Sequence, residues 1–158
     1  MKYVRIGKIV NTHGIKGELR ILSDFKYKDK VFKKDMKFYV GKNKDEFTIN
    51  SYRFHKIFDM VTFVGFNNIN DVEYLKGDYV FVNEEDIKLD DNEVLASTLI
   101  GYKVMIGDKD AGLVTEIIDT PANEVIKADV LIPYVKEFIN KIDKDNKIIY
   151  VNDVRGLM

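Results

Sequence analysis

β-Branched residues dominate the aliphatic content of this chain, and this feature constrains its fold more than any other. Valine and isoleucine number 17 and 18, whereas alanine and leucine number only 4 and 9. Branching at Cβ restricts side-chain rotamers in a helix but fits the pleated surface of a sheet. The 9 tyrosines and 10 phenylalanines favour strands as well, and only 2 prolines interrupt them. The sequence therefore predicts an all-β protein.

Short apolar runs separated by turn residues recur along the chain. Gly, Asn and Asp are frequent between them, as in residues 41–45 and 143–146. Strands of this length and spacing are typical of small barrels and sandwiches. The charged segment 23–35 predicts a loop that can hold a helical turn. The predicted strands cover residues 3–10, 18–22, 36–40, 46–54, 60–66, 78–82, 100–106, 112–118, 124–127, 129–132, 134–140 and 147–151.

One segment, residues 70–76, has the features of a helix. Asn70 can accept a hydrogen bond at the N-cap, and acidic residues follow it at the positive end of the helix dipole. Val72 and Leu75 lie three positions apart and so share one face. Gly77 can adopt the left-handed conformation that ends a helix. We expect this helix to precede the last strand of the first half.

An acidic stretch divides the chain. Residues 84–93 contain six Asp and Glu and a single lysine, and few apolar contacts can cross such a segment. The short strands on either side suffice for one small barrel each. We therefore predict two small β-barrels, an N-terminal domain over residues 1–83 and a C-terminal domain over residues 94–158, joined by a linker over residues 84–93.

The formal net charge of −1 hides an uneven distribution. Residues 1–44 carry 13 Lys and Arg against 4 Asp and Glu, whereas residues 87–158 carry 9 against 13. This asymmetry suggests that the two halves meet different partners, one of which is RNA. A Lys-rich composition that simply drifts along the chain is the alternative.

The sequence offers little material for catalysis or metal binding. It has no cysteine and only 2 histidines, which excludes thiol chemistry and a zinc site of four nitrogen and sulfur ligands. No glycine-rich phosphate loop and no Gly-x-Ser-x-Gly or His-Glu-x-x-His motif occurs. The absence of cysteine suits a reducing cytosol, and no apolar run approaches the roughly 20 residues of a membrane helix. We expect a cytoplasmic protein that is not an enzyme and needs no cofactor, metal, membrane or small-molecule substrate.

The segment HGIKGELR, residues 13–20, is the first candidate for binding. Its two glycines lie three apart, permit positive φ and can bring backbone N–H groups to an anion. The imidazole, ammonium and guanidinium groups around this turn predict contact with RNA phosphate or an acidic partner, with base stacking on the histidine. A tight connection in which the glycines serve geometry alone is the alternative. The candidate residues are His13, Gly14, Ile15, Lys16, Gly17 and Arg20.

A second candidate lies at the start of the C-terminal half, with a related segment further on. An apolar cluster followed by glycine and tyrosine can form a docking surface, since tyrosine is favoured in interface cores. A barrel strand that buries alternate residues is the more ordinary interpretation. Pro133 lacks a backbone donor and indicates a sheet edge or corner. The candidate residues are Leu99, Ile100, Gly101, Tyr102, Pro133 and Tyr134.

These segments, in this order, resemble the ribosome maturation factor RimM family. Gly7-Lys8-Ile9 followed by residues 13–18 is similar to the family's opening signature. Residues 70–77 are similar to its short helix, and Leu99-Ile100-Gly101 to the start of its PRC-barrel domain. Each motif alone is modest, but the ordered set is specific and spans nearly the whole chain. The remaining matches are Pro121-Ala122-Asn123-Glu124-Val125, Leu131-Ile132-Pro133-Tyr134, Ile142-Asp143 and Gly156-Leu157.

The resemblance implies a non-enzymatic assembly factor for the small (30S) ribosomal subunit. It implies a translation-factor-like N-terminal barrel, a C-terminal PRC barrel, and ribosomal protein S19 and 30S precursor particles with 16S rRNA as partners. The implied role is in 16S rRNA processing and maturation of the head region. We expect the first candidate segment to contact RNA and the second to bind S19. A PRC-barrel adaptor unrelated to ribosomes, and an RNA-modifying or hydrolytic enzyme that uses carboxylates, are the alternatives.

One departure from the family pattern lies just before the Leu-Ile-Gly motif. The family often carries paired aromatics there, where this chain has Val94 and Leu95, and an acid where it has Thr98. If the aromatic pair anchors S19, this chain either uses Tyr102 and Tyr134 instead or binds more weakly.

Overall fold

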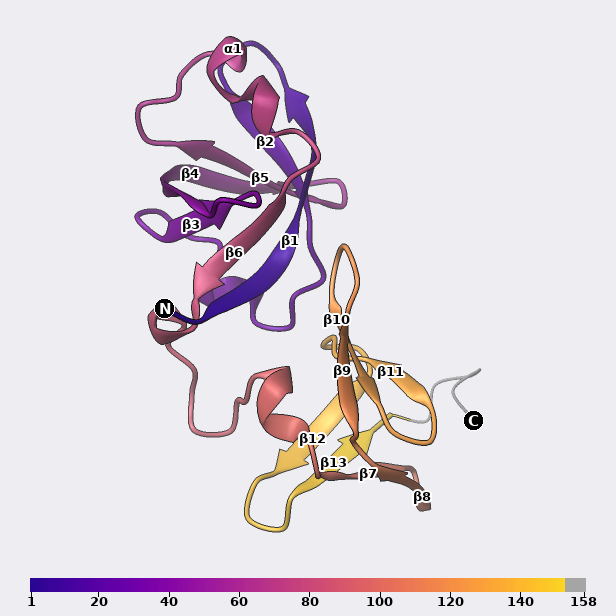
Figure 1. The fold of residues 1–158 in the computed structure, drawn as a ribbon. Coiled ribbons are helices and arrows are strands. Elements are labelled where there is room, and N and C mark those ends of the chain that lie inside the picture. Colours follow the sequence, from indigo (N-terminus) through magenta and orange to yellow (C-terminus); the bar gives the residue numbers. More distant parts are fainter. Residues whose placement is uncertain (153–158) are drawn as a thin grey trace. The chain divides into compact units, whose positions relative to one another are not determined.

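The computed structural model describes residues 1–152, which form two compact units (Figure 1). The first unit runs from Met1 to Lys88, and the second begins at Leu89. Strands make up most of the regular structure of both units, so the predicted all-β class is confirmed. The expected Gly156-Leu157 match lies outside the described residues.

Six strands of the first unit form a closed antiparallel barrel in the order β1-β2-β5-β4-β3-β6, in which β6 pairs back to β1. Each strand overlaps one predicted from the sequence. The register shifts along β1 and along the β4–β5 pair, and such bulges allow long strands to bend around a small barrel. The strands are β1 (Tyr3–His13), β2 (Glu18–Leu22), β3 (Lys37–Val40), β4 (Asp45–His55), β5 (Phe58–Phe63) and β6 (Tyr79–Asn83).

The interior of this barrel is apolar and rich in aromatic rings. Phe47 and Phe63 stack with their centroids 4.7 Å apart, and Phe38 packs edge-on against Phe63 at 6.3 Å. Burial of such side chains supplies most of the stabilising free energy of a small domain. Other wholly buried members of the core are Ile6, Ile9, Leu19, Ile21, Ile49 and Val61.

The charged segment between β2 and β3 is a loop with one 3-10 turn, η1 (Lys28–Lys30), as predicted. It is anchored more firmly than its charges suggest. Phe32 stacks on Tyr52 at 5.6 Å, and the ammonium group of Lys28 lies 2.6 Å from the buried carboxylate of Asp59. Tyr52 donates to the same carboxylate, and burial together with this contact raises the pKa of Tyr52. The loop is therefore tied to the barrel by both apolar and ionic contacts.

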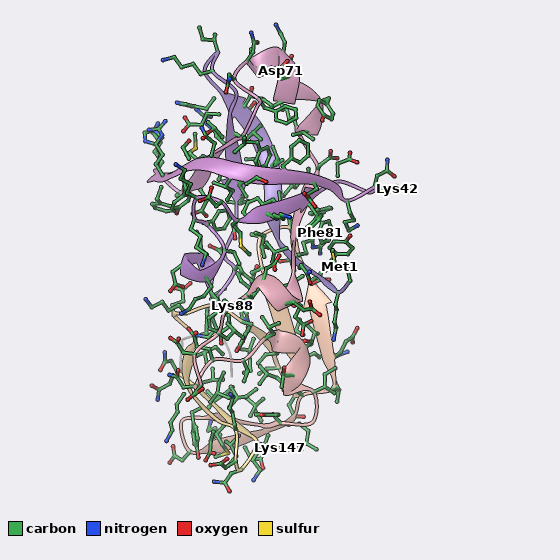
Figure 2. All side chains as sticks on the ribbon, turned by 90° about the vertical axis from the view of Figure 1, so that its left-hand side faces the viewer. Met1, Lys42, Asp71, Phe81, Lys88 and Lys147 are labelled. Atoms are coloured by element: carbon green, nitrogen blue, oxygen red, sulfur yellow. The ribbon has the colours of Figure 1, made fainter. Side chains whose placement is uncertain are left out.

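The predicted helix is present, but it is shifted and split. α1 (Ile69–Val72) begins after Asn68, whose side chain accepts from the Asn70 N–H, so the N-cap assigned to Asn70 is wrong. Both asparagines are competent caps, and the apolar spacing alone does not choose between them. The chain continues as a 3-10 turn, η2 (Glu73–Leu75), and the carboxylate of Asp71 is exposed at the first turn (Figure 2). As predicted, the apolar face is buried and the following glycine has positive φ, at Val72, Leu75 and Gly77.

The acidic stretch is ordered where it leaves the first unit. It forms a 3-10 turn, η3 (Glu84–Asp86), and Ile87 is buried. The Glu84 N–H donates to the carbonyl of Lys2 at 2.8 Å, which ties the turn to the start of β1. Further along, Val94 and Leu95 are buried. The residues that replace the family's aromatic pair therefore lie in the interior of this protein.

The strands of the second unit form two sheets among the residues described. One has the order β11-β10-β9, and the other has the order β12-β13-β7-β8, with β13 and β7 parallel. Both lie in the orange to yellow part of the chain in Figure 1. The elements are η4 (Ala96–Leu99), β7 (Lys103–Ile106), β8 (Lys109–Leu113), β9 (Glu116–Asp119), β10 (Glu124–Lys127), β11 (Leu131–Pro133), β12 (Ile139–Asp143) and β13 (Ile148–Val151).

The predicted strands 100–106, 112–118 and 134–140 differ most from the observed ones. β7 begins only at Lys103, because Gly101 has a φ of 91° and turns the chain first. The predicted strand 112–118 divides into β8 and β9 at Val114, whose N–H donates to the carbonyl of Tyr102. Residues 134–138 form a connection before β12 rather than a strand. Apolar alternation indicates extended chain, but it does not show where the pairing partner changes.

Candidate nucleic-acid interface

The turn between β1 and β2 has the backbone that its glycines predict. Gly14 and Gly17 have φ of 73° and 84°, a region that favours glycine. A Cβ at Gly17 would stand 2.7 Å from the carbonyl oxygen of Phe66, whereas nothing lies within 4 Å of a Cβ at Gly14. The Ile69 N–H donates to the carbonyl of Ile15 at 3.0 Å. The turn is therefore held in place against the start of α1.

Residues of this turn line an open hollow of about 380 Å³. Ile15 at this turn is 78% exposed, and Lys16 beside it is also exposed. An open hollow suits contact with a large partner, whereas small molecules are bound in more enclosed pockets. The lining residues are His13, Gly14, Ile15, Lys16, Glu18 and Thr62.

Arg20 of β2 joins the turn to the outer surface of the barrel. Its Nη2 donates to Nδ1 of His13 at 2.7 Å. Because a guanidinium group only donates, Nδ1 of His13 is the acceptor, and the proton of the neutral ring is on Nε2. The guanidinium carbon lies 5.7 Å from the centroid of the Phe58 ring, within the range of a cation–π contact. Two of the predicted residues thus touch each other.

β4 adds two residues that were not among the sequence-based candidates, Arg53 and His55. Arg53 donates to both carboxylate oxygens of Glu18, at 2.9 and 2.7 Å, in the two-pronged arrangement that suits these groups. The His55 ring centroid lies 5.9 Å from that of His13. Strand alternation places Arg53 and His55 on one face, and this signal could have revealed them. We refer to His13, Glu18, Arg20, Arg53 and His55 as the basic cluster.

These contacts shift pKa values within the basic cluster. The hydrogen bond from Arg53 lowers the pKa of Glu18, with the charge of Arg53 acting in the same direction. Desolvation lowers the pKa of His55, and the positive charges of Arg53 and Lys56 lower it further. Glu18 is therefore ionised at neutral pH, and His55 is neutral. The cluster is cationic, with its one carboxylate already paired.

The second predicted site is built differently, because several of its side chains are internal. Leu99, Tyr102 and Tyr134 are buried, and the hydroxyl of Tyr134 donates to the carbonyl of Val94 at 2.6 Å. Their side chains support the second unit from within, as in the more ordinary of the two sequence interpretations.

The exposed part of the second site centres on Ile100, which is 56% exposed. Gly101 follows with positive φ, and its N–H donates to the carbonyl of Val114 at 2.8 Å. Pro133, at the end of β11, is half-buried. The turn at Gly101 thus holds one apolar side chain at the surface, above a well-packed interior.

No group of three or more His, Cys, Asp or Glu side chains among residues 1–152 is placed to hold a metal ion. Within the same residues, no helix is both long and apolar enough to cross a membrane. The basic cluster offers one carboxylate, and Arg53 already occupies it. The basic cluster can therefore bind an additional anion.

A closed barrel with cationic side chains on its outside, followed by a second β unit, defines a protein that acts by binding through its surface. Residues 4–87 match the family model of the RimM N-terminal domain, and residues 96–157 match that of the RimM PRC barrel domain. The chain belongs to the RimM family of ribosome maturation factors, which are assembly factors rather than enzymes. The resemblance noted in the sequence is confirmed.

The similarity to relatives extends over nearly the whole chain. The ribosome maturation factor RimM of Staphylococcus saprophyticus is 43% identical to it, and that of Staphylococcus epidermidis is 40% identical, each over 98% of both chains. A crystal structure from Pseudomonas aeruginosa, described as a 16S ribosomal RNA processing protein RimM, is 20% identical. It covers 96% of this chain and 97% of its own, with a TM-score of 0.50. This last likeness supports the fold alone.

Proposed function

We propose that this protein assists maturation of the head region of the small ribosomal subunit and processing of 16S rRNA, in the cytoplasm. Its first unit contacts 16S rRNA of a 30S precursor particle, and its second unit binds ribosomal protein S19. Such a role needs surface complementarity and no bond making or breaking. The family membership and the relatives named ribosome maturation factor support this proposal.

The observation that carries the RNA contact is the basic cluster together with its turn. Lys16 is exposed beside the cluster, and Arg20 has a guanidinium group that no carboxylate of the described residues neutralises. Cations on an open surface bind the phosphate backbone and release its counterions, which gives affinity with strong salt dependence. The surplus of basic residues in the first 44 positions acts in the same direction over a longer range.

The proposed S19 contact rests on the second unit. Residues 87–158 carry an excess of acidic residues, which complements a basic ribosomal protein and speeds its encounter. Ile100 and Pro133 supply the apolar contact at the surface. Leu99, Gly101, Tyr102 and Tyr134 shape the backbone beneath it.

Titration of the full-length chain with purified S19, at two salt concentrations, tests this assignment. We expect saturable binding that Ile100→Glu weakens at least tenfold, because the substitution places a charge in an apolar contact. Val64→Glu is the matched control, since Val64 is 53% exposed but belongs to the first unit. Thermal unfolding checks that both variants fold.

Two results would count against the proposal. Equal loss of affinity in Ile100→Glu and Val64→Glu would remove the site from the second unit. No binding of the wild-type chain to S19 or to immature particles would leave the family fold serving another protein partner.

A further inference from the structure

The only two histidines of the chain come together on the outside of the barrel. β1 ends at His13 and β4 ends at His55, and these two strands do not pair with each other. Their ring centroids nevertheless lie 5.9 Å apart, with a tilt of 52°. Neither ring donates to a carboxylate in residues 1–152, so the pair is not explained by an ion pair within the cluster.

Arg20 reaches the same place from β2, and it has hydrogen-bonding capacity left over. One of its nitrogens donates to His13, while its Nε is buried and has no hydrogen-bond partner among the described residues. A buried donor on a charged group is costly to leave unsatisfied. Because Nε is enclosed, an acceptor from outside meets the guanidinium group at its terminal nitrogens, neither of which is buried without a partner.

The one acidic residue of the cluster does not fill this role. Both oxygens of Glu18 accept from Arg53, and Arg20 forms no ion pair with a carboxylate in the described part of the chain. Arg53 is thus neutralised, whereas the charge of Arg20 is not. Lys16 and Lys56 are exposed at the turns that follow β1 and β4, and both add positive potential.

We propose that His13, Arg20 and His55 together form a binding site for one phosphate group of an RNA backbone. This inference rests on the proposed function and names the ligand group that the first unit takes from the precursor particle. Arg20 supplies the permanent charge, and the Nε2–H of His13 supplies a donor. His55 contributes a second imidazole, which becomes a cationic donor when it takes up a proton.

Binding at this site is coupled to proton uptake. In the free protein the imidazolium form of His55 is opposed by desolvation and by the positive charges of Arg53, Lys56 and Arg20. A phosphate group opposes these effects, because it adds negative charge beside the His55 ring. The affinity for RNA therefore rises as the pH falls through the range in which His55 takes up its proton, and it reaches a plateau once this ring is charged in the free protein.

The imidazole proton signals in nuclear magnetic resonance report on this site directly. Only two such residues exist, and the single variants His13→Asn and His55→Asn assign their signals. The pH titration is run in sodium chloride, in inorganic phosphate and with a single-stranded uridine hexanucleotide, all at equal ionic strength. We expect the RNA to raise the pKa of His55 by about one unit.

Each alternative result overturns the inference. RNA that binds without moving the pKa of His55 is bound elsewhere. An effect of inorganic phosphate with none from RNA makes this a site for a free anion. If the double variants Lys33→Ala/Lys34→Ala and His13→Asn/His55→Asn lose the same amount of RNA affinity, the binding is a general polyelectrolyte effect.

Affinity measured against pH separates this inference from the proposed function. From pH 7.5 to 5.5 we expect RNA affinity of the wild type to rise about tenfold, and His55→Asn to lose most of that rise. Lys33→Ala/Lys34→Ala, which removes two exposed lysines of the same unit, should keep it. If precursor particles bind with no dependence on the histidines, the phosphate site is wrong and the proposed function stands. If RNA binds as described but particles do not, the proposed function is wrong.

Discussion

The two candidate interfaces of this protein are built in opposite ways. In the first unit, charged side chains lie on the outside of a closed barrel, and strand pairing brings His13, Arg20 and His55 together. In the second unit, the conspicuous side chains of the motif, Leu99 and Tyr102, point inward. Polar residues of the first motif thus indicate the surface, whereas Leu99 and Tyr102 of the second belong to the core.

The difference follows from the free energy of burial. A guanidinium or imidazole group stays at the surface unless it is paired, because desolvation of a charge is expensive. Burial of leucine and tyrosine side chains lowers the free energy of the folded state wherever the interior has space for them. A motif made of such residues therefore specifies a fold before it specifies a partner, and only its exposed member, Ile100, is directly available for contact.

The substitution with the largest expected effect on stability is at Leu99, which is wholly buried. Leu99→Ala should lower the free energy of unfolding of the second unit by about 2–5 kcal/mol, because it leaves a cavity. Ile100→Ala, one residue further on and mostly exposed, should change it by about 0.5 kcal/mol or less. Urea denaturation of the two variants measures both. Similar losses would contradict the division into core and contact residues.

A pair of glycines sharpens the account of the first unit. Gly17→Ala should cost about 3 kcal/mol, because positive φ is combined with a clash against the Phe66 carbonyl. Gly14→Ala, with positive φ but open space around it, should cost only about 1 kcal/mol. Thermal unfolding compares them. Equal costs would mean that the turn does not depend on its contact with the segment leading to α1.

Tyr134 allows a smaller test in the second unit. Tyr134→Phe keeps the ring but removes the donor to the Val94 carbonyl, and we expect a loss of about 1 kcal/mol in unfolding free energy. S19 binding should be unchanged after correction for the folded fraction. Strongly weakened binding at full stability would place the Tyr134 hydroxyl in the interface instead.

The smallest expected effect concerns Glu18. Arg53→Ala removes the hydrogen bonds that lower the pKa of Glu18, so this pKa should rise toward its ordinary value. A carboxylate with a lowered pKa in the folded state stabilises the protein above its unfolded pKa, and this contribution is lost as the pH falls through the folded value. The variant should lose less stability than the wild type on acidification. Carboxyl carbon chemical shifts and unfolding at acid and neutral pH check both statements.

Much of the fold could be predicted from the sequence, because strand content follows from residue type and turn composition. All six barrel strands overlap predicted runs, and the glycines of the first turn have the positive φ expected of them. The helix begins after Asn68 rather than at Asn70, because both asparagines can cap a helix and the apolar spacing does not choose between them. The order of strands around the barrel depends on long-range pairing, which no local pattern records.

The candidate site was predictable only where its residues are close in sequence. His13 and Arg20 belong to one segment, and they touch. Arg53 and His55 lie on β4, which reaches β2 only through β5, so their membership in the cluster required the fold. The anchoring of Lys28 on buried Asp59 was hidden for the same reason.

The salt dependence of binding to immature small-subunit particles tests the central claim most directly. For the wild type, the logarithm of the affinity should fall linearly with the logarithm of the salt concentration. Lys16→Ala/Arg20→Ala should weaken binding and make this slope shallower by about 1.5 to 2, whereas Lys33→Ala/Lys34→Ala should leave it nearly unchanged. An unaltered slope in Lys16→Ala/Arg20→Ala would contradict a contact between the basic cluster and RNA.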